Sequence, residues 1–227
     1  MAETDWTPLA NSLEPEQISR GRTTASEFGI VDGSAAVGFH SLDAAAGLSG
    51  FVSALVGFAP IANRKGGIIT ALVKKHAPMA GGAPLLFFVN SPDALAAEGY
   101  ILGLTEEWPY SIALKRGMLS AGLKGDNALA KSSAVFSAAA WLELALYVTV
   151  NTQNDIVLRV LRRDPVLTGA WAAVPGIDDV IDDAVGLLTG TPPVYGDFYP
   201  GFGHYNSGQS GRVSLFDHIT IARQTAP

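Results

Sequence analysis

A group of aromatic, imidazole and amide side chains near the C-terminus has the chemistry of a contact surface. Its members lie in or beside a glycine-rich connection: Tyr199, Phe202, His204, Tyr205 and Asn206. Aromatic rings can stack on a sugar, and amide groups can hydrogen-bond to it. The same side chains can also contact a protein partner or pack over the end of a domain. The residues alone leave these three alternatives open.

Metal-ion chemistry finds little support in the residue spacing. The four histidines are His40, His76, His204 and His218. None of them has the short spacing of a zinc site, and the chain has no cysteine. We therefore expect no metal and no cofactor. His204 and His218 are expected to form hydrogen bonds near a loop or at a strand surface.

An acidic segment is the other place where a cation could bind. Its carboxylates are Asp178, Asp179, Asp182 and Asp183. Calcium prefers clustered carboxylates, but in a loop that can wrap around the ion. Apolar residues 177, 180, 181 and 185 have helical spacing, which predicts a short helix with a solvated acidic face.

The composition favours a β-rich domain with a large core or interface. Of the 227 residues, 48% are hydrophobic and 16% are charged, and the 25 glycines and 13 prolines predict many turns. A net charge of -6 with scattered basic residues gives no support for nucleic-acid binding. No apolar run reaches the ~20 residues of a membrane helix, so we expect no membrane insertion.

The clearest strands lie in residues 141–163. Leu144 and Leu146 alternate with Glu143 and Tyr147, which predicts a strand with its leucines toward the core. A polar turn at residues 151–155 follows, and a second strand then completes a hairpin expected near the centre of its sheet.

Other strands follow from apolar runs between turn signals. Residues 100–104 and 111–115 predict a hairpin around a charged loop, and residues 85–90 predict a buried strand. Residues 51–58 and 68–75 flank a Gly-Gly turn, which predicts another hairpin. The expected closing strands cover residues 199–205 and 212–221, while residues 28–31 and 35–39 are expected to form the first hairpin.

The first 17 residues have the character of an arm. Trp6 is an isolated apolar residue in a polar setting. It is either part of a disordered tail, an anchor on a neighbouring subunit, or packed on its own domain. We therefore divide the chain into an arm, residues 1–17, and a single domain, residues 18–227, and count Trp6 among the candidate partner contacts.

Two stretches resemble concanavalin A-like and laminin-G-like jelly rolls. They are residues 141–160, where a tryptophan opens a long strand before a polar turn, and residues 201–223, where the final strand carries Phe216 and Asp217. The resemblance covers roughly residues 140–223. It implies an all-β fold, a two-sheet antiparallel jelly-roll sandwich, to which the helical spacing adds one short helix. The calcium loops of plant lectins do not occur here.

Catalytic motifs are not found. Glycoside hydrolases of this group carry carboxylates at alternate positions of one strand. Here Glu143 stands alone on its strand, and Glu106 and Glu107 are adjacent in a loop. Residues 208–211 lack the spacing of a nucleophile elbow. We therefore expect no enzyme activity.

The resemblance also extends to phage-encoded members of the group, many of which are virion proteins. It implies a structural component of a phage virion or tail-like particle, made in the bacterial host cytoplasm. Its partners would be other copies of the chain and neighbouring virion proteins. Depletion of charge at interface cores fits such an assembly role. The alternative is a carbohydrate- or receptor-binding module that contacts a glycan.

Overall fold

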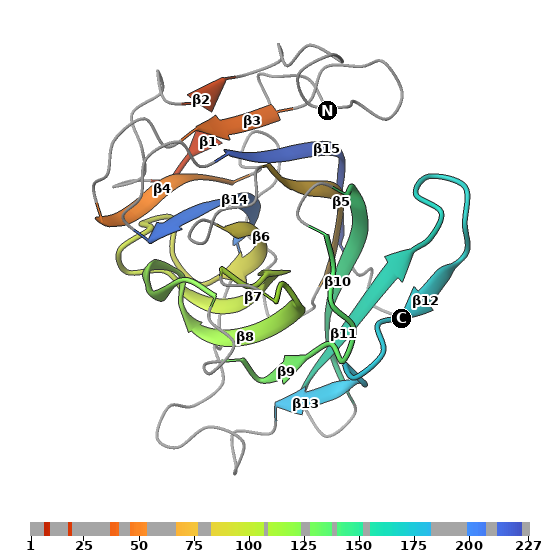
Figure 1. Cartoon of the computed structure of the whole chain (residues 1–227). Coiled ribbons are helices and arrows are strands. Elements are labelled where there is room, and N and C mark those ends of the chain that lie inside the picture. Colours follow the sequence, from red (N-terminus) through yellow and green to blue (C-terminus); the bar gives the residue numbers. More distant parts are fainter. Residues whose placement is uncertain are drawn as a thin grey trace.

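A computed structural model describes residues 7–9, 18–19, 37–40, 46–53, 67–76, 83–106, 109–123, 128–137, 140–151, 155–182, 199–207 and 213–223. All the strand pairs among them are antiparallel, and they form two sheets (Figure 1). The only helical element in these ranges is a single 3-10 turn, η3 (Leu119–Ala121). None of the described helical segments is long and apolar enough to cross a membrane.

The first sheet has seven strands. In spatial order they are β1 (Thr7–Pro8), β4 (Ala46–Ser53), β14 (Tyr199–Ser207), β6 (Ala83–Val89), β7 (Glu98–Leu104), β8 (Ile112–Met118) and β9 (Ala130–Lys131). β6 is buried along its whole length because neighbours cover both of its faces. Leu86 and Phe88 point into the space between the sheets, whereas Leu85 and Phe87 point to the opposite face.

The second sheet has eight strands. In spatial order they are β12 (Trp171–Ala173), β11 (Ile156–Arg163), β10 (Leu142–Val150), β5 (Gly67–His76), β15 (Val213–Arg223), β3 (Val37–His40) and β2 (Ile18–Ser19), with β13 (Val180–Asp182) also paired to β11. β12 and β13 pair with the two ends of the same edge of β11, at residues 161–163 and 156–158.

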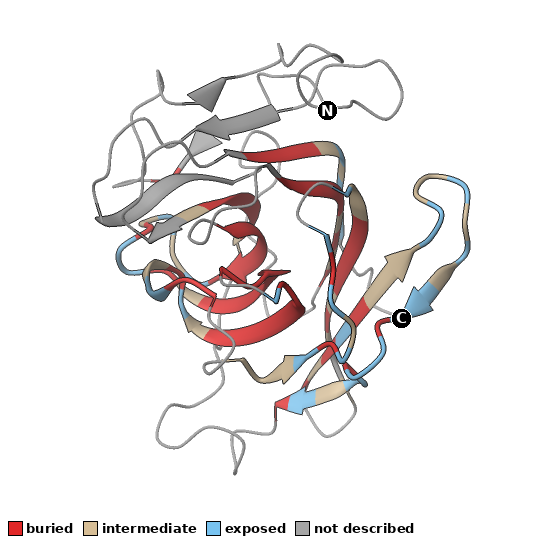
Figure 2. Ribbon diagram, in the orientation of Figure 1, coloured by how far each residue is buried: buried red, intermediate tan, exposed pale blue. Residues whose placement is uncertain are grey.

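The main hydrophobic core lies between the two sheets. Leu144, Leu146 and Val148 of β10 join Leu102 of β7 and Phe202 of β14 in one buried cluster. Buried residues dominate β6, β7 and β8 and the facing strands, whereas β12 and β13 are largely exposed or half-buried (Figure 2). The two-sheet antiparallel sandwich expected from the sequence is therefore confirmed.

A second, smaller core covers the other face of the seven-stranded sheet. It joins Leu85 and Phe87 of β6 to Leu119 and Leu123 from the loop after β8. Leu9, next to β1, is 2% exposed and belongs to the same cluster. Residues 7–9 of the expected arm thus pack on their own domain, whereas Trp6 lies outside the described residues.

Two of the hairpins predicted from the sequence are confirmed. β7 pairs with β8, and β10 pairs with β11 in the register that places Glu143 opposite Arg163. On β10 the leucines face the core, and Glu143 and Tyr147 face away from it, as their alternation indicated. The β10–β11 hairpin lies toward the β12 edge of its sheet and not at its centre.

Two expectations are wrong. β4 and β5 do not form a hairpin, because β4 pairs with β1 and β14 in one sheet and β5 pairs with β10 and β15 in the other. The short helix expected from residue 177 is also absent, since residues 180–182 form strand β13 against β11. The predicted strand at residues 28–31 and residues 183–185 of the predicted helix lie outside the described residues.

Candidate functional site

The aromatic group near the C-terminus does not form one surface. Phe202 and His204 are each 1% exposed, because alternation along β14 points them into the space between the sheets. The Phe202 ring lies 5.0 Å from that of Phe216, and Nδ1 of His204 lies 2.7 Å from Oγ of Ser214. Phe202 and His204 are therefore parts of the core. This corrects the expectation that His204 lies at a surface and that Phe202 contacts a ligand.

Tyr199 and Tyr205, two other members of the group, lie on the opposite face of the sheet. Tyr199 and Tyr205 are half-buried against the second core, six residues and therefore about 20 Å apart along β14. The backbone of Asn206 pairs with Gly47, while its side chain lies outside the described residues. The structure does not bring these side chains together as one contact surface.

Tyr205 has a charged neighbour in Glu106. A β-carbon built on Gly122 would lie 2.4 Å from Oε1 of Glu106 and 2.5 Å from Tyr205, and the φ of Gly122 is +65°. Only glycine fits this close approach. Burial raises the pKa of Tyr205, and the charge of Glu106 adds to the effect. Glu106 itself is buried and accepts a hydrogen bond from the backbone N–H of Leu123.

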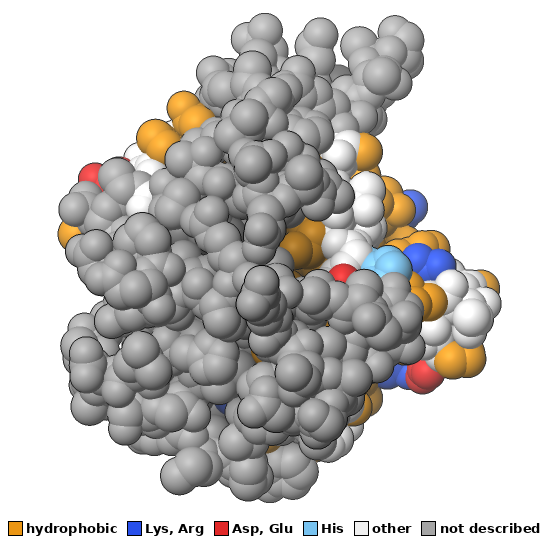
Figure 3. All heavy atoms as spheres, turned by 90° about the horizontal axis from the view of Figure 1, so that it is seen from above, with side chains coloured by type: hydrophobic (Ala, Val, Ile, Leu, Met, Phe, Trp, Pro, Cys, Tyr) orange, Lys and Arg blue, Asp and Glu red, His pale blue; other side chains and the backbone are white. Residues whose placement is uncertain are grey.

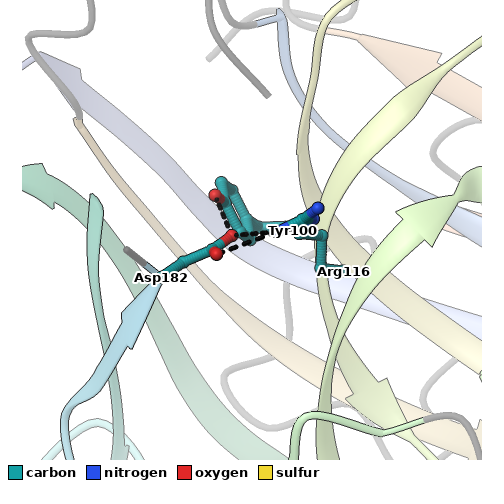
Figure 4. A network of polar contacts seen from close by, with 3 residues as sticks. All are labelled: Tyr100, Arg116 and Asp182. Carbon is teal, nitrogen blue, oxygen red and sulfur yellow. Dashed lines mark hydrogen bonds and ion pairs between the residues drawn. The ribbon is translucent and has the colours of Figure 1, made fainter. Parts of the chain in front are cut away.

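In the acidic segment, which is not a helix, Asp182 joins the two sheets, while Asp178 and Asp179 are exposed. Asp182 is buried, and its carboxylate accepts bonds of 2.8 and 2.9 Å from Arg116 and of 2.7 Å from the hydroxyl of Tyr100 (Figure 4). The network fastens β13 to β7 and β8 across the two sheets. Asp179 is exposed and forms an ion pair with Arg159, whose hydrogen bond lowers the pKa of Asp179.

Carboxylates in the described ranges do not gather as metal ligands. No group of three or more histidine, cysteine, aspartate or glutamate side chains that could hold an ion occurs in this part of the chain. Asp179 and Asp182 lie against different arginines, which draw their carboxylates apart.

A site that the sequence did not reveal lies on the outer face of the eight-stranded sheet, the face that points away from the core. Trp171 of β12 pairs with Arg163 of β11, and Arg163 pairs with Glu143 of β10. Directly paired residues project to the same face, so these three side chains form a row across the strands. The Arg163 guanidinium carbon lies 4.7 Å from the centre of the Trp171 ring and within cation–π range.

The loop between β11 and β12 is fastened to this row. Arg163 forms an ion pair with Glu143 and donates a 3.1 Å bond to the carbonyl oxygen of Leu167. Glu143 accepts a 2.6 Å bond from the backbone N–H of Leu167. Leu167 has a φ of +63°, a conformation unfavourable for a leucine that these two bonds help to hold.

A second tryptophan completes the site. Trp141 lies two residues before Glu143 and is half-buried, and Nζ of Lys74 on β5 lies 5.8 Å from its ring centre. Burial lowers the pKa of Lys74. We name Trp141, Trp171, Glu143 and Arg163 the tryptophan site.

Viewed from above, the side of the molecule that carries the β11–β12 hairpin in Figure 1 shows hydrophobic side chains together with basic, acidic and histidine side chains (Figure 3). Trp171 was missed because it belongs to a three-residue strand without periodicity. Only its pairing with β11 places it beside Glu143.

Comparison with known proteins shows the fold. No protein-family model and no curated protein matches the chain. The carbohydrate recognition domain of Emp47p is similar at a TM-score of 0.53 and 8% identity, over 99% of this chain and 97% of that chain. The exoplasmic/lumenal domain of VIP36, in a form with Ca²⁺ and Man3GlcNAc bound, gives 0.51 and 13% identity, over 100% and 91%.

A GH43 glycoside hydrolase is also similar, at a TM-score of 0.51 and 10% identity. The match covers 98% of this chain and 41% of that enzyme. At such identities these likenesses establish a lectin-like jelly-roll sandwich and nothing about activity.

Proposed function

We propose that this chain is a non-catalytic carbohydrate-binding domain, and that it binds glycan at the tryptophan site. One observation carries the proposal: two half-buried tryptophans, Trp141 and Trp171, share one end of the outer sheet face, and each lies against a cation. Each ring is partly exposed, which gives a ligand access to part of its surface.

The chemistry of the site suits a sugar. A pyranose ring presents C–H groups on its faces and hydroxyl groups around its edge. The faces can stack on indole rings, which are apolar and carry negative charge density. The hydroxyls need polar neighbours, which the backbone of residues 164–170 and the exposed side chain of Asp164 can supply.

Rigid support strengthens the proposal. Trp171 and Glu143 stand on strands that both pair with β11, and Glu143 accepts a hydrogen bond from the backbone of Leu167 in the neighbouring loop. Groups fixed before binding lose little conformational entropy when a ligand arrives. Two of the similar structures add support at the level of the fold, since one is a carbohydrate recognition domain and the other was solved with Man3GlcNAc bound.

The test is a glycan array followed by calorimetry with the best-bound glycan. Trp171→Ala is expected to weaken binding at least about fivefold, because a stacked aromatic contact contributes on the order of 1 kcal/mol or more. Trp141→Ala is expected to weaken it as well. Tyr147→Ala, on the same face of β10 but away from the site, is the matched control and should bind normally. Binding to no glycan, or equal binding by Trp171→Ala, would refute the proposal.

A second candidate is the assembly role that the sequence suggested, as a subunit of a phage virion or tail-like particle. It is favoured by apolar side chains that surround the Arg159–Asp179 ion pair on the outer face of β10, β11 and β13: Tyr147, Val157, Leu161 and Ile181. Ile181 is 48% exposed, and the other three are half-buried. None of the structures named above is described as a virion protein.

Native mass spectrometry separates the two candidates. A repeated subunit should give a closed oligomer that Ile181→Lys dissociates, since a buried unpaired charge is unfavourable at an interface. Leu95→Lys, at an apolar position that is 56% exposed in the loop between β6 and β7 of the other sheet, is its control. A monomer at all concentrations would rule out self-assembly, while a glycan-binding monomer would agree with the first candidate.

A further inference from the structure

Both terminal nitrogens of Arg163 already donate a hydrogen bond within the protein. One of its terminal nitrogens is paired with Glu143, and the other donates to the carbonyl oxygen of Leu167. Its Nε atom is buried and has no hydrogen-bond partner in the structure. One face of the guanidinium lies against Trp171. The side chain is therefore engaged both along its edge and on its face.

The positive charge of Arg163 is also compensated by a carboxylate of the protein itself. Glu143 is 4% exposed, so its carboxylate is hidden from solvent directly beside the guanidinium. The other arginines of β11 follow the same rule, because Arg159 is paired with Asp179 and Arg162 with Asp164. Each arginine of this strand thus forms an ion pair with a different carboxylate.

Recognition of an acidic sugar would need the opposite arrangement. A carboxylate or sulfate group is bound best by an arginine that offers two parallel N–H groups and an uncompensated charge. Here each terminal nitrogen already uses one N–H group within the protein, and Glu143 compensates the charge of the guanidinium. Asp164, whose side chain is 68% exposed at the start of the loop, is paired with Arg162 and so leaves that arginine without an uncompensated charge as well.

We infer that the tryptophan site selects uncharged glycans over uronic acid and sulfated glycans, and that Glu143 determines this selectivity by neutralising Arg163. The inference rests on the proposed function. It assigns Glu143 a positioning role, since the carboxylate acts on the ligand only through Arg163 and Leu167.

The experiment uses three pairs of oligosaccharides that differ only in charge: cellohexaose and its C6-oxidised acid, mannohexaose and hexamannuronate, and galacturonate hexamer with and without methyl esterification. Calorimetry is performed with the full chain. The wild-type chain should bind the neutral member of at least one pair and prefer it to the acidic member.

Glu143→Gln should reverse this preference. The amide keeps the shape of the carboxylate and can still accept the Leu167 bond, but it leaves Arg163 with a net charge. Binding of the acidic member should tighten about fivefold to tenfold, and added salt should abolish the gain. The matched control is Asp179→Asn, which removes the negative charge paired with Arg159 on the same strand. It should not tighten the binding of the acidic member.

The outcomes separate this inference from the proposed function. A wild-type preference for any acidic member would overturn the inference and leave the glycan site intact. An equal gain in Asp179→Asn and Glu143→Gln would also overturn it, because the effect would then be one of overall charge. Failure of the wild-type chain to bind any of the six probes or any array glycan would overturn both. The wild-type comparison decides the matter even if Glu143→Gln does not fold.

Discussion

Asp182 lies in the interior together with the two groups that stabilise its charge. Arg116 and Tyr100 come from the opposite sheet, so the network of Figure 4 joins elements separated by 66 and 82 residues in the chain. A buried ion pair is not by itself strongly stabilising, because both charges give up their hydration. The free energy of unfolding falls strongly, however, when one partner is removed and the other stays buried without a compensating charge.

We therefore predict that Asp182→Ala lowers the free energy of unfolding by about 3–5 kcal/mol. Urea denaturation monitored by tryptophan fluorescence measures the change. Asp179→Ala removes the exposed partner of Arg159 and is the control, with an expected loss below about 1 kcal/mol. Similar losses in the two variants would mean that the Asp182 network has no special role.

Tyr205 gives a prediction in the alkaline range. Its pKa is raised in the folded chain by burial and by Glu106, so the neutral phenol is favoured by folding. This contribution to stability is complete below the unfolded pKa of about 10 and is lost as the pH rises through the higher folded value. Stability should therefore fall more steeply above pH 10 in the wild type than in Tyr205→Phe. Urea denaturation at pH 8 and at pH 11 tests this, and parallel losses would contradict it.

At the scale of the elements, local pairing was predictable and long-range pairing was not. The β7–β8 and β10–β11 hairpins join neighbouring segments, and alternation along each strand fixes which face is buried. β4 and β5 are also neighbours in the sequence, but they cross from one sheet to the other. Their residues carry no signal that distinguishes a hairpin from a crossover, because both sheets offer an apolar face.

β13 shows why a helical spacing can mislead. The apolar residues at 177, 180 and 181 fit one helix face, yet the same residues also fit a short strand in which Val180 points inward and Ile181 outward. Pairing with β11 and the buried contact of Asp182 decide between the two. Neither interaction is visible in the local sequence, since Arg116 and Tyr100 lie far away in the chain.

The faces of β10 can be tested by truncation. Leu144 is fully buried in the main core, and Leu144→Ala should cost about 2–5 kcal/mol of unfolding free energy. Ile181→Ala, at an exposed position, should cost less than about 0.5 kcal/mol. The comparison uses chemical denaturation at neutral pH, and a loss below about 1 kcal/mol at Leu144 would mean that its face was assigned wrongly.

For the whole molecule, the sandwich was predictable from composition, turns and alternation, while the tryptophan site was not. That site exists only through the order of strands in one sheet, which brings residues 143, 163 and 171 into a row. For the group around His204 the sequence predicted a contact surface that the fold does not form. A glycine-rich, aromatic sequence resembles a surface loop, but β14 lies inside its sheet and buries alternate side chains on both faces.

The molecule should not depend on a metal ion. Asp179 and Asp182 are occupied by arginines, and their sheet contacts hold β13 without a cation. We expect the melting temperature of the chain to be the same, within about 1 °C, with and without excess EDTA. Differential scanning calorimetry measures it, with added Ca²⁺ as the reverse experiment. A large drop on chelation would instead indicate a structural ion.

The edge of the eight-stranded sheet has a consequence for colloidal behaviour. β12 and β13, three residues each, both pair with the same edge of β11. This side of the sheet therefore ends in two short strands and not in one long strand with unpaired backbone groups. Long unpaired edges promote strand addition between molecules, which leads to aggregates and fibrils. Here a second molecule would find room for only two or three backbone bonds at a time. The β11 side should therefore resist fibril growth even in concentrated solutions, and its resistance should depend on β13 remaining fastened by Asp182.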